Sequence, residues 1–281
     1  MRCTYRYAVM IYPVESCEAG PQSGIQPGRG CSATQQMDFL RSHQSFDFQM
    51  VVRESTRRIH PMVSIGAKQP TAGIILAAGI SRRLGQPKQL LRFQGKFLLE
   101  NILENALASR LDTVVLVLGH QAQKIVKVLG AKLDRPRLKV IVNRQYREGM
   151  SSSLRAGLRE VMEFPSVMFL LGDQPWINNQ LINLLLDRFR KSEKDICVPV
   201  HQDRRGNPVI FSRRFYDTLM KIEGDIGARE VIASNPRDLL EVEVSDPDVF
   251  SDIDTVSDLE ALNAMPAIRP LPINGSDPED L

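Results

Sequence analysis

The sequence has few cysteines, a single tryptophan and no long apolar run. Its four cysteines are spread over 281 residues and form no CxxC pair, so neither a disulfide framework nor a cysteine-based metal site is predicted. Cys197 stands among apolar residues and is expected to be an inert, packed thiol. No apolar stretch approaches the ~20 residues of a membrane-spanning helix. These absences exclude an integral membrane protein and favour the reducing cytoplasm.

A strong charge of one sign is also missing from most of the chain. The formal net charge is +3, from 36 Lys and Arg against 33 Asp and Glu. Residues 1–70 hold the whole surplus, because they contain eight basic and five acidic residues. The remainder is neutral and lacks the sustained basic face of a nucleic-acid-binding protein. Hydrophobic residues make up 43% of the chain, which is ordinary for a globular protein.

The chain divides into three unequal parts. Residues 1–70 have poor apolar periodicity and a Gly-, Pro-, Gln- and Ser-rich stretch from Gly20 to Ser32, which predicts a poorly ordered extension. The functional protein is expected to begin near Met50 or Met62. Residues 265–281 contain four prolines and are predicted to be a flexible tail.

Residues 71–264 alternate short apolar runs with amphipathic stretches. The predicted strands are 73–78, 113–118, 138–142, 167–171 and 195–200, and the predicted helices are 97–109, 121–129, 151–163 and 178–191. Strands that are apolar on both sides suit a parallel sheet covered on both faces. The pattern therefore predicts a Rossmann-like, doubly wound α/β fold with a mostly parallel sheet and helices on both faces.

Small and basic residues follow the first predicted strand, where the sequence reads LAAGISRRLGQPK from Leu76 to Lys88. Ligands of open parallel sheets bind at the carboxyl ends of the strands. The glycine and alanines let backbone come close to a ligand, and the cations suit a polyphosphate; these residues are Ala77, Ala78, Gly79, Arg82, Arg83 and Lys88. The stretch is neither a Walker A loop nor a dinucleotide GxGxxG. A basic surface loop is the plain alternative.

Acidic residues at two places suggest a metal site. Asp173 directly follows predicted strand 167–171, so its carboxylate would face the ligand crevice. Asp252 and Asp254 share one face of an extended segment, while Ile253 points to the core. Carboxylate oxygens beside phosphates suit Mg²⁺, which predicts a site made by Asp173 with Asp254 or Asp252. The alternative role for Asp173 is a helix N-cap.

Other polar residues allow two interpretations each. The Ser-rich run Gly149–Ser153 opens a predicted helix, and we expect it, with Ser152 in particular, to bind an anion or the nucleotide or simply to cap the helix. Arg229 is a candidate either for phosphate binding or for a surface ion pair. His120 and His201 are predicted to be ordinary loop histidines.

The string after the first strand resembles the signature LAAGxSxRxGxxK of the MobA-like nucleotidyltransferases. The matching positions are Leu76, Ala77, Ala78, Gly79, Ser81, Arg83, Gly85 and Lys88. The resemblance runs from about residue 72 to 264 and implies that 71–264 is a nucleotidyltransferase domain. It implies that Arg83 and Lys88 are catalytic cations and that Mg²⁺ is held by Asp173 with Asp254, or else Asp252. The implied nucleotide-binding residues are Leu76, Ala77, Ala78, Gly79, Ser81, Arg83, Lys88, Ser152 and Asp173.

Smaller features resemble the cytidylyl-transferring branch of this family. Ala78 stands where guanylyl-transferring members typically have glycine, and Pro87 rather than an acid precedes Lys88. The segments 172–175, 206–209 and 224–229 also look like that branch. The resemblance implies that CTP and molybdenum-loaded molybdopterin are the substrates and that pyrophosphate is released. It also suggests an apo-molybdoenzyme as a partner, and Trp176 is either packed or lines the pterin pocket. No nucleic-acid or membrane partner is expected.

Three other interpretations stay open at this point. The same fold can transfer guanylate to molybdopterin or cytidylate to another phosphate acceptor. It can also serve as an oxidoreductase or a non-catalytic maturation protein for molybdenum enzymes, because fold does not determine chemistry. The third alternative is a regulator that binds a nucleotide without turnover.

Overall fold

The computed structural model describes residues 70–81, 86–225 and 227–245, together with residues 251, 253, 255, 257, 258 and 260. All of them belong to one of two units of the chain, which comprises Met1–Glu15 and Lys68–Leu281. The other unit, Ser16–Ala67, lies outside the described residues. The extension over residues 1–70 and the tail over 265–281 therefore remain predictions.

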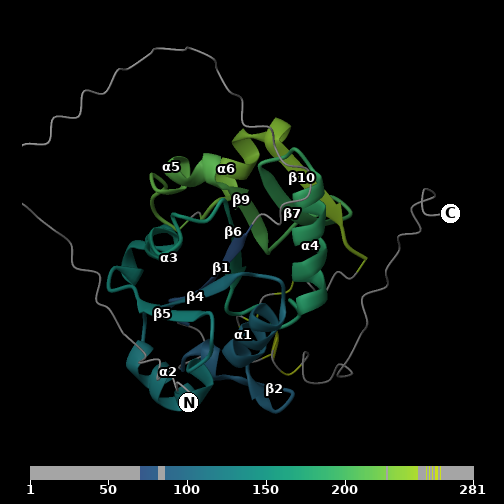
Figure 1. The fold of residues 1–281 in the computed structure, drawn as a ribbon. Coiled ribbons are helices and arrows are strands. Elements are labelled where there is room, and N and C mark those ends of the chain that lie inside the picture. The colour runs from purple at the N-terminus through teal and green to yellow at the C-terminus, as the bar shows by residue number, and fades with distance from the viewer. Residues whose placement is uncertain are drawn as a thin grey trace, which may run out of the picture. The chain divides into compact units, whose positions relative to one another are not determined.

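An eight-stranded mixed sheet forms the centre of the described chain (Figure 1). Its order is β10–β7–β9–β6–β1–β4–β5, and β8 pairs with β7. The strands are β1 (Thr71–Ala77), β4 (Thr113–Leu118), β5 (Leu138–Val142), β6 (Ser166–Leu171), β7 (Ile196–His201), β8 (Arg204–Arg205), β9 (Val209–Ser212) and β10 (Leu239–Glu243). Strands β5, β4, β1 and β6 are parallel neighbours, which confirms the predicted mostly parallel sheet.

Strand β9 is an antiparallel insertion that the apolar pattern did not predict. It lies between β6 and β7 and runs against both, with Phe211 opposite Val167 on one side and Ile196 on the other. Beyond it, β7 and β10 are again parallel to each other. The predicted alternation of strand and helix therefore holds along the chain from β1 to β7 and fails after β7, where β8 and β9 follow without an intervening helix.

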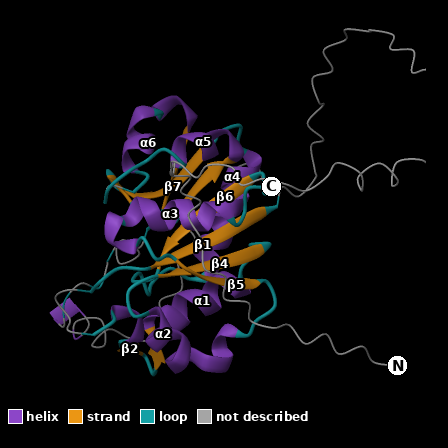
Figure 2. Cartoon of the chain, turned by 90° about the vertical axis from the view of Figure 1, so that its left-hand side faces the viewer, coloured by secondary structure: helices purple, strands orange, loops and turns teal. Residues whose placement is uncertain are grey.

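Both faces of the sheet are apolar because both are covered. Successive side chains of a strand point to opposite faces, so Ile74 joins one core cluster and Ile75 the other, and neither is exposed to solvent. Helices α1 (Leu98–Ala108), α2 (Ala122–Leu129) and α4 (Asn179–Lys191) pack on the Ile75 face. Helices α3 (Met150–Arg159), α5 (Tyr216–Leu219) and α6 (Arg229–Ser234) pack on the Ile74 face (Figures 1 and 2). The predicted doubly wound arrangement is confirmed.

The helix ends follow local hydrogen bonding. The Asn178 side chain accepts from the N–H of Leu181 at 2.9 Å and caps α4, which begins one residue later than predicted. Helix α3 ends at Arg159 rather than at the predicted residue 163. There the N–H of Glu160 donates to the carbonyl of Gly157 at 3.1 Å, so the last turn tightens before the chain enters β6.

A small separate core lies beside the hairpin of β2 (Arg92–Phe93) and β3 (Lys96–Phe97). Ile253 is 2% exposed and packs with Phe93 and Trp176 in this cluster. The Trp176 ring meets Phe93 edge-on, with 5.3 Å between ring centroids. Trp176 is thus packed, which is the first of its two interpretations. None of the described helices is long and apolar enough to cross a bilayer.

Candidate active site

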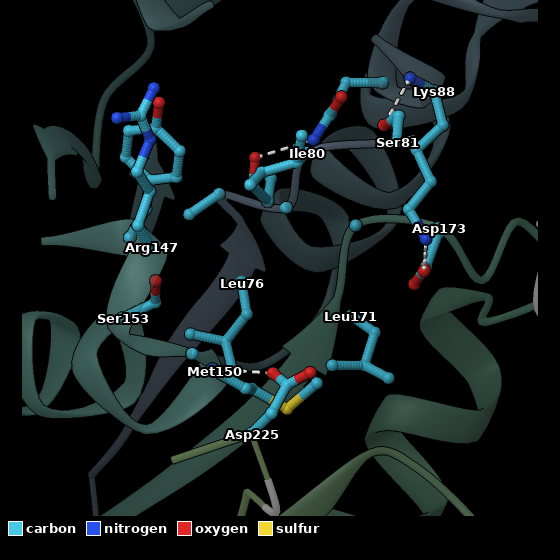
Figure 3. A pocket seen from close by; sticks show the side chains of 17 residues that line it. Leu76, Ile80, Ser81, Lys88, Arg147, Met150, Ser153, Leu171, Asp173 and Asp225 are labelled. Carbon is cyan, nitrogen blue, oxygen red and sulfur yellow. Dashed lines mark hydrogen bonds and ion pairs between the residues drawn. The ribbon is translucent and has the colours of Figure 1, made fainter. Parts of the chain in front are cut away.

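A cavity of about 520 Å³ opens at the carboxyl ends of β1 and β6 (Figure 3). This is the edge at which open parallel sheets bind ligands. Its walls come from the loop after β1, from η1 (Lys88–Leu90), from η3 (Tyr146–Glu148) with the start of α3, from the end of β6, and from Asp225. Of the predicted nucleotide-binding residues, the cavity is lined by Leu76, Ala77, Ala78, Gly79, Ser81, Lys88 and Asp173.

The loop after β1 is held closely against its neighbours. The N–H of His120 donates to the Ala78 carbonyl at 3.2 Å. A Cβ on Gly119 would lie 2.7 Å from the Cβ of Ala78, so only glycine lets the end of β4 approach this loop. The Ser81 hydroxyl accepts from the backbone N–H of Lys88 at 3.0 Å and joins the two ends of the loop. Arg83 and Gly85 lie between them, outside the described residues.

Lys88 and Asp173 form an ion pair at one end of the cavity. The Lys88 ammonium donates to Oδ2 of Asp173, and the two side chains are only 18% and 17% exposed (Figure 3). The next residue, Gln89, is buried and donates through Nε2 to the Ala77 carbonyl at 2.8 Å. η1 therefore positions a cation over the carboxylate and also supports the loop after β1.

Asp173 is also joined to the C-terminal part of the domain. The backbone N–H of Ile253 donates to the carbonyl of Asp173 at 3.3 Å. Asp252 and Asp254, the predicted partners of Asp173 in a metal site, lie outside the described residues. Within the described part of the chain, no cluster of three acidic, His or Cys side chains is arranged to hold a metal ion. One carboxylate together with phosphate and water oxygens nevertheless suits Mg²⁺, and Asp173 offers that carboxylate.

The start of α3 presents Ser153, rather than Ser152, to the cavity. The Ser152 hydroxyl is buried, donates to the carbonyls of Gln145 and Gly149 at 2.9 Å each, and accepts from Asn143 at 2.8 Å. Asn143 also donates to the Ser153 oxygen at 3.0 Å, which leaves the Ser153 O–H to donate into the cavity. In this geometry Ser152 bonds to the backbone, and Ser153 rather than Ser152 lines the cavity.

A segment from beyond β9 closes the cavity next to α3. The Asp225 carboxylate accepts from the N–H of Met150 through Oδ1 at 2.9 Å, and the Gly224 carbonyl accepts from the N–H of Ser151 at 3.1 Å. These bonds satisfy two free N–H groups at the start of α3. Arg229 is exposed at the start of α6 and does not line the cavity.

Neither of the two histidines considered above lines the cavity. The His120 ring lies 5.9 Å from the Tyr146 ring, centroid to centroid. His201 is the last residue of β7 rather than part of a loop, and its Nδ1 is 2.8 Å from the Val244 carbonyl oxygen. The described cavity wall therefore supplies cations, hydroxyls and carboxylates, without a histidine.

Several lining residues were given no site role from the sequence. These are Ile80, Gln89, Tyr146, Arg147, Leu171, Gly172 and Asp225. Arg147 lies two residues before the Ser-rich run Gly149–Ser153, so a wider window around that run would have found it. Asp225 lies within the segment 224–229, which was noted only as a local pattern.

Comparison with known proteins places this geometry in a family. The family described as the MobA-like NTP transferase domain matches residues 73–239. A probable molybdenum cofactor guanylyltransferase of Methanosarcina acetivorans is 31% identical, over 64% of this chain and 81% of that protein. The molybdenum cofactor cytidylyltransferase of Escherichia coli is 25% identical, over 64% and 88% of the two chains. The nicotine blue oxidoreductase of Paenarthrobacter nicotinovorans is 29% identical, over 64% and 90%.

A solved structure shares the same arrangement. The protein Rv0371c of Mycobacterium tuberculosis H37Rv, in complex with manganese, superposes with a TM-score of 0.58. The two sequences are 28% identical, and the match covers 69% of this chain and 97% of that one. The likeness therefore spans nearly the whole of the M. tuberculosis protein.

Proposed function

We propose that this chain, which belongs to the family of MobA-like NTP transferase domains and is a nucleotidyltransferase, transfers cytidylate from CTP to the phosphate of molybdenum-loaded molybdopterin. Pyrophosphate is the second product. The observation that carries the proposal is the meeting of Lys88 and Asp173 beside the small-residue loop after β1. A cation and a carboxylate at that point suit a triphosphate that arrives with a divalent metal.

The triphosphate belongs at the Lys88 end of the cavity. The Lys88 ammonium would neutralise charge on the leaving pyrophosphate, and the exposed Gly79 leaves room for backbone to approach the phosphate oxygens. Arg83, from the same loop, is proposed to share this role. A loss of one such contact in the transition state typically costs about 3–4 kcal/mol.

Asp173 is the proposed metal ligand, together with Asp254 or Asp252. The bond from the Ile253 N–H to the Asp173 carbonyl supports this set, because Ile253 is the residue between the two other acids. Mg²⁺ bound there would offset the charge of the triphosphate and the acceptor phosphate. The manganese complex of the M. tuberculosis relative supports a divalent ion of this kind.

Hydrogen-bond donors on the α3 side of the cavity suit the cytosine ring. The Ser153 O–H and the Arg147 guanidinium both line this side, and Arg147 lies over the Tyr146 ring at 5.7 Å from its centroid. Cytosine presents two acceptors, O2 and N3, next to one amino donor. Two donor side chains match those acceptors, which supports CTP as the nucleotide.

The reaction needs positioning and charge neutralisation more than proton transfer. An oxygen of the acceptor phosphate attacks the α-phosphorus of CTP, a new P–O bond forms, and the bond to the β-phosphate oxygen breaks. The attacking phosphate is ionised at neutral pH, so no general base is required. This agrees with a described cavity wall that contains no histidine. Lys88 and Asp173 then act by holding the reacting groups in line.

The test is a nucleotide panel with the natural acceptor. The protein is incubated with molybdenum-loaded molybdopterin, Mg²⁺ and either CTP, GTP or ATP, and the products are identified by mass and by pyrophosphate release. A cytidylyl product formed by the wild type and lost in Asp173→Asn supports the proposal. Near-normal turnover by Asp173→Asn in a folded protein would rule out its metal role.

Guanylyl transfer to molybdopterin is the second candidate. It is favoured by the 31% identity to the probable guanylyltransferase of M. acetivorans. Ala78, at the position where guanylyl-transferring members typically carry glycine, argues against it. The panel separates the two, because a product that carries guanylate and no cytidylate would replace the first proposal with the second.

A further inference from the structure

We propose that Asp225, with the apolar side chains of Leu76, Met150 and Leu171, forms the subsite for the heterocyclic ring of the acceptor. In this subsite Asp225 accepts hydrogen bonds from the N–H and amino groups of the ring. The inference rests on the proposed function and deepens it, because it assigns one end of the cavity to the pterin.

The Asp225 carboxylate is held in place before any ligand binds. Its Oδ1 accepts from the Met150 N–H at 2.9 Å, and the preceding Gly224 carbonyl accepts from Ser151 at 3.1 Å. The Arg155 guanidinium, one turn further along α3, donates to the Ile222 carbonyl. A Cβ on Gly149 would lie 2.5 Å from the carbonyl atoms of Gly224, so the two backbones are in close contact. A side chain fixed in this way loses little entropy when it binds a ligand.

One oxygen of this carboxylate remains available. Among the described residues nothing donates to Oδ2 of Asp225, and the residue is exposed to solvent in the cavity wall. Figure 3 shows the dashed line from Met150 reaching one oxygen of Asp225, while no dashed line reaches the other. A carboxylate that only capped α3 would need neither a cavity position nor a second oxygen open to a ligand. Both oxygens retain lone pairs for donors.

Apolar side chains lie beside this carboxylate. Met150 is 38% exposed, which is unusual among the large apolar residues that the structure describes, and it lines the cavity with Leu76 and Leu171 (Figure 3). A Cβ on Gly227 would be 3.0 Å from the Met150 sulfur, so the backbone supports the thioether from behind. Thioethers make favourable contacts with aromatic rings. The combination suits a flat heterocycle with donors on one edge.

Charge excludes the triphosphate from this end. Among the described residues no cation pairs with the Asp225 carboxylate, which therefore repels phosphates, whereas at the other end of the cavity Lys88 pairs with Asp173 beside Ser81 (Figure 3). The proposed cytosine contacts, Arg147 and Ser153, lie on a third side (Figure 3). The Asp225 end is therefore left to the acceptor.

The donor pattern of a pterin matches a carboxylate. The pyrimidinone edge of a pterin carries a ring N–H next to a 2-amino group, so two adjacent donors meet two acceptor oxygens. Cytosine carries one amino donor flanked by an acceptor and fits less well. Guanine shares the donor pair of the pterin, so guanine nucleotide binding is an outcome that the test must separate.

The test uses the full chain, two phosphate-free ring probes and a matched variant. Pterin has the 2-amino group, and lumazine has an oxygen in its place. Asp225→Asn retains an oxygen that can cap Met150 but presents an NH₂ group where Oδ2 was. Asp217→Asn removes one exposed acid from α5, away from the cavity, and is the control. Binding is followed by pterin and lumazine fluorescence, and the KM values for molybdopterin and CTP are measured in parallel.

We expect the wild type and Asp217→Asn to bind pterin about tenfold or more tightly than lumazine, a typical effect of a hydrogen bond to a charged group. Asp225→Asn should lose that preference and show a raised molybdopterin KM with an unchanged CTP KM. If Asp225→Asn still bound pterin more tightly than lumazine, the proposed subsite would be wrong. It would also be wrong if Asp225→Asn changed the KM for CTP or GTP and left the KM for molybdopterin unchanged. Asp225-dependent pterin binding without any nucleotidyl transfer would instead refute the proposed function and leave the subsite standing.

Discussion

The ammonium group of Lys88 lies on Oδ2 of Asp173, in the carboxylate that is the proposed metal ligand. The two residues come from different strands of the sheet, since Lys88 follows the loop after β1 and Asp173 follows β6. The pair keeps a largely buried carboxylate neutralised while the cavity contains no ligand. It also makes Lys88 and a divalent ion two cations that would share, or compete for, the same carboxylate.

Replacement of Lys88 should therefore separate turnover from metal binding. In Lys88→Met, turnover should fall about 10²–10³-fold because the departing pyrophosphate loses a cation. Mn²⁺ should bind at least as tightly as in the wild type, because its competitor at Asp173 is gone. Steady-state kinetics and Mn²⁺ electron paramagnetic resonance measure the two quantities. The control is Lys139→Met, which breaks a surface ion pair with Glu160. Equal losses of turnover in the two variants would contradict a catalytic role for Lys88.

Replacement of Ile253 should lower the stability of the fold and also raise the Mg²⁺ concentration that turnover requires. Ile253→Ala would leave a cavity in the small core beside Phe93 and Trp176, at a cost of about 2 kcal/mol or more in the free energy of unfolding. Because the backbone of Ile253 is bonded to Asp173, the Mg²⁺ concentration for half-maximal turnover should also rise. Ile182→Ala, in the fully buried face of α4, should lose comparable stability with an unchanged Mg²⁺ requirement. Urea unfolding and Mg²⁺ titrations test both statements, and identical Mg²⁺ curves for the two variants would contradict the second.

Two glycines with positive φ should differ in their tolerance of alanine. Gly95, at the β2–β3 turn, has a φ of +81° and open space around it, so Gly95→Ala should cost on the order of 1 kcal/mol from backbone strain alone. Gly149 has a φ of +105°, and its added Cβ would meet Gly224 at 2.5 Å. Gly149→Ala should therefore cost more in the free energy of unfolding and also raise the molybdopterin KM, because it displaces the segment that carries Asp225. If the two variants had the same free energy of unfolding, the contact between residue 149 and Gly224 would relax without a loss of stability.

The buried thiol of Cys197 should make stability fall at high pH. Burial raises the pKa of Cys197 from 9.0 to about 12. Between these values the unfolded chain has lost this proton and the folded chain has kept it, so rising pH favours unfolding by up to ~1.4 kcal/mol per pH unit. Denaturant unfolding at about pH 8 and pH 10 should show a larger loss for the wild type than for Cys197→Ala. If the wild type and Cys197→Ala lost the same stability between these pH values, groups other than Cys197 would be responsible for the loss.

The sequence allowed the parallel half of the fold to be predicted. Predicted strands 113–118 and 138–142 coincide with β4 and β5, because strands of a covered parallel sheet are rich in Val, Ile and Leu. β9 was missed because a four-residue run, Val209–Ser212, carries no sign of its direction. Its antiparallel place is determined by tertiary pairing with β6 and β7.

The same limit applies to the site. The loop after β1 was predictable because its residues are contiguous and share one chemical character, and Asp173 was predictable because it follows a strand. Asp225 lies far from both in sequence, and only the contacts of Gly224 and Asp225 with the start of α3 bring it to the cavity. The choice between Ser152 and Ser153 depended on Asn143, whose side chain bonds to both hydroxyls.

The cavity is built from two stretches of chain that meet at α3, where Gly224 and Asp225 contact its first turn and Ile222 contacts Arg155. The earlier stretch holds the proposed nucleotide contacts, and the later one, reached after the reversed strand β9, holds Asp225. Substitutions in the segment 222–228 can therefore change the acceptor without removing any of the proposed nucleotide contacts. Evolution could change the acceptor of such a scaffold while keeping its nucleotide. Exchange of the 222–228 segment between relatives would be the smallest change that could do so.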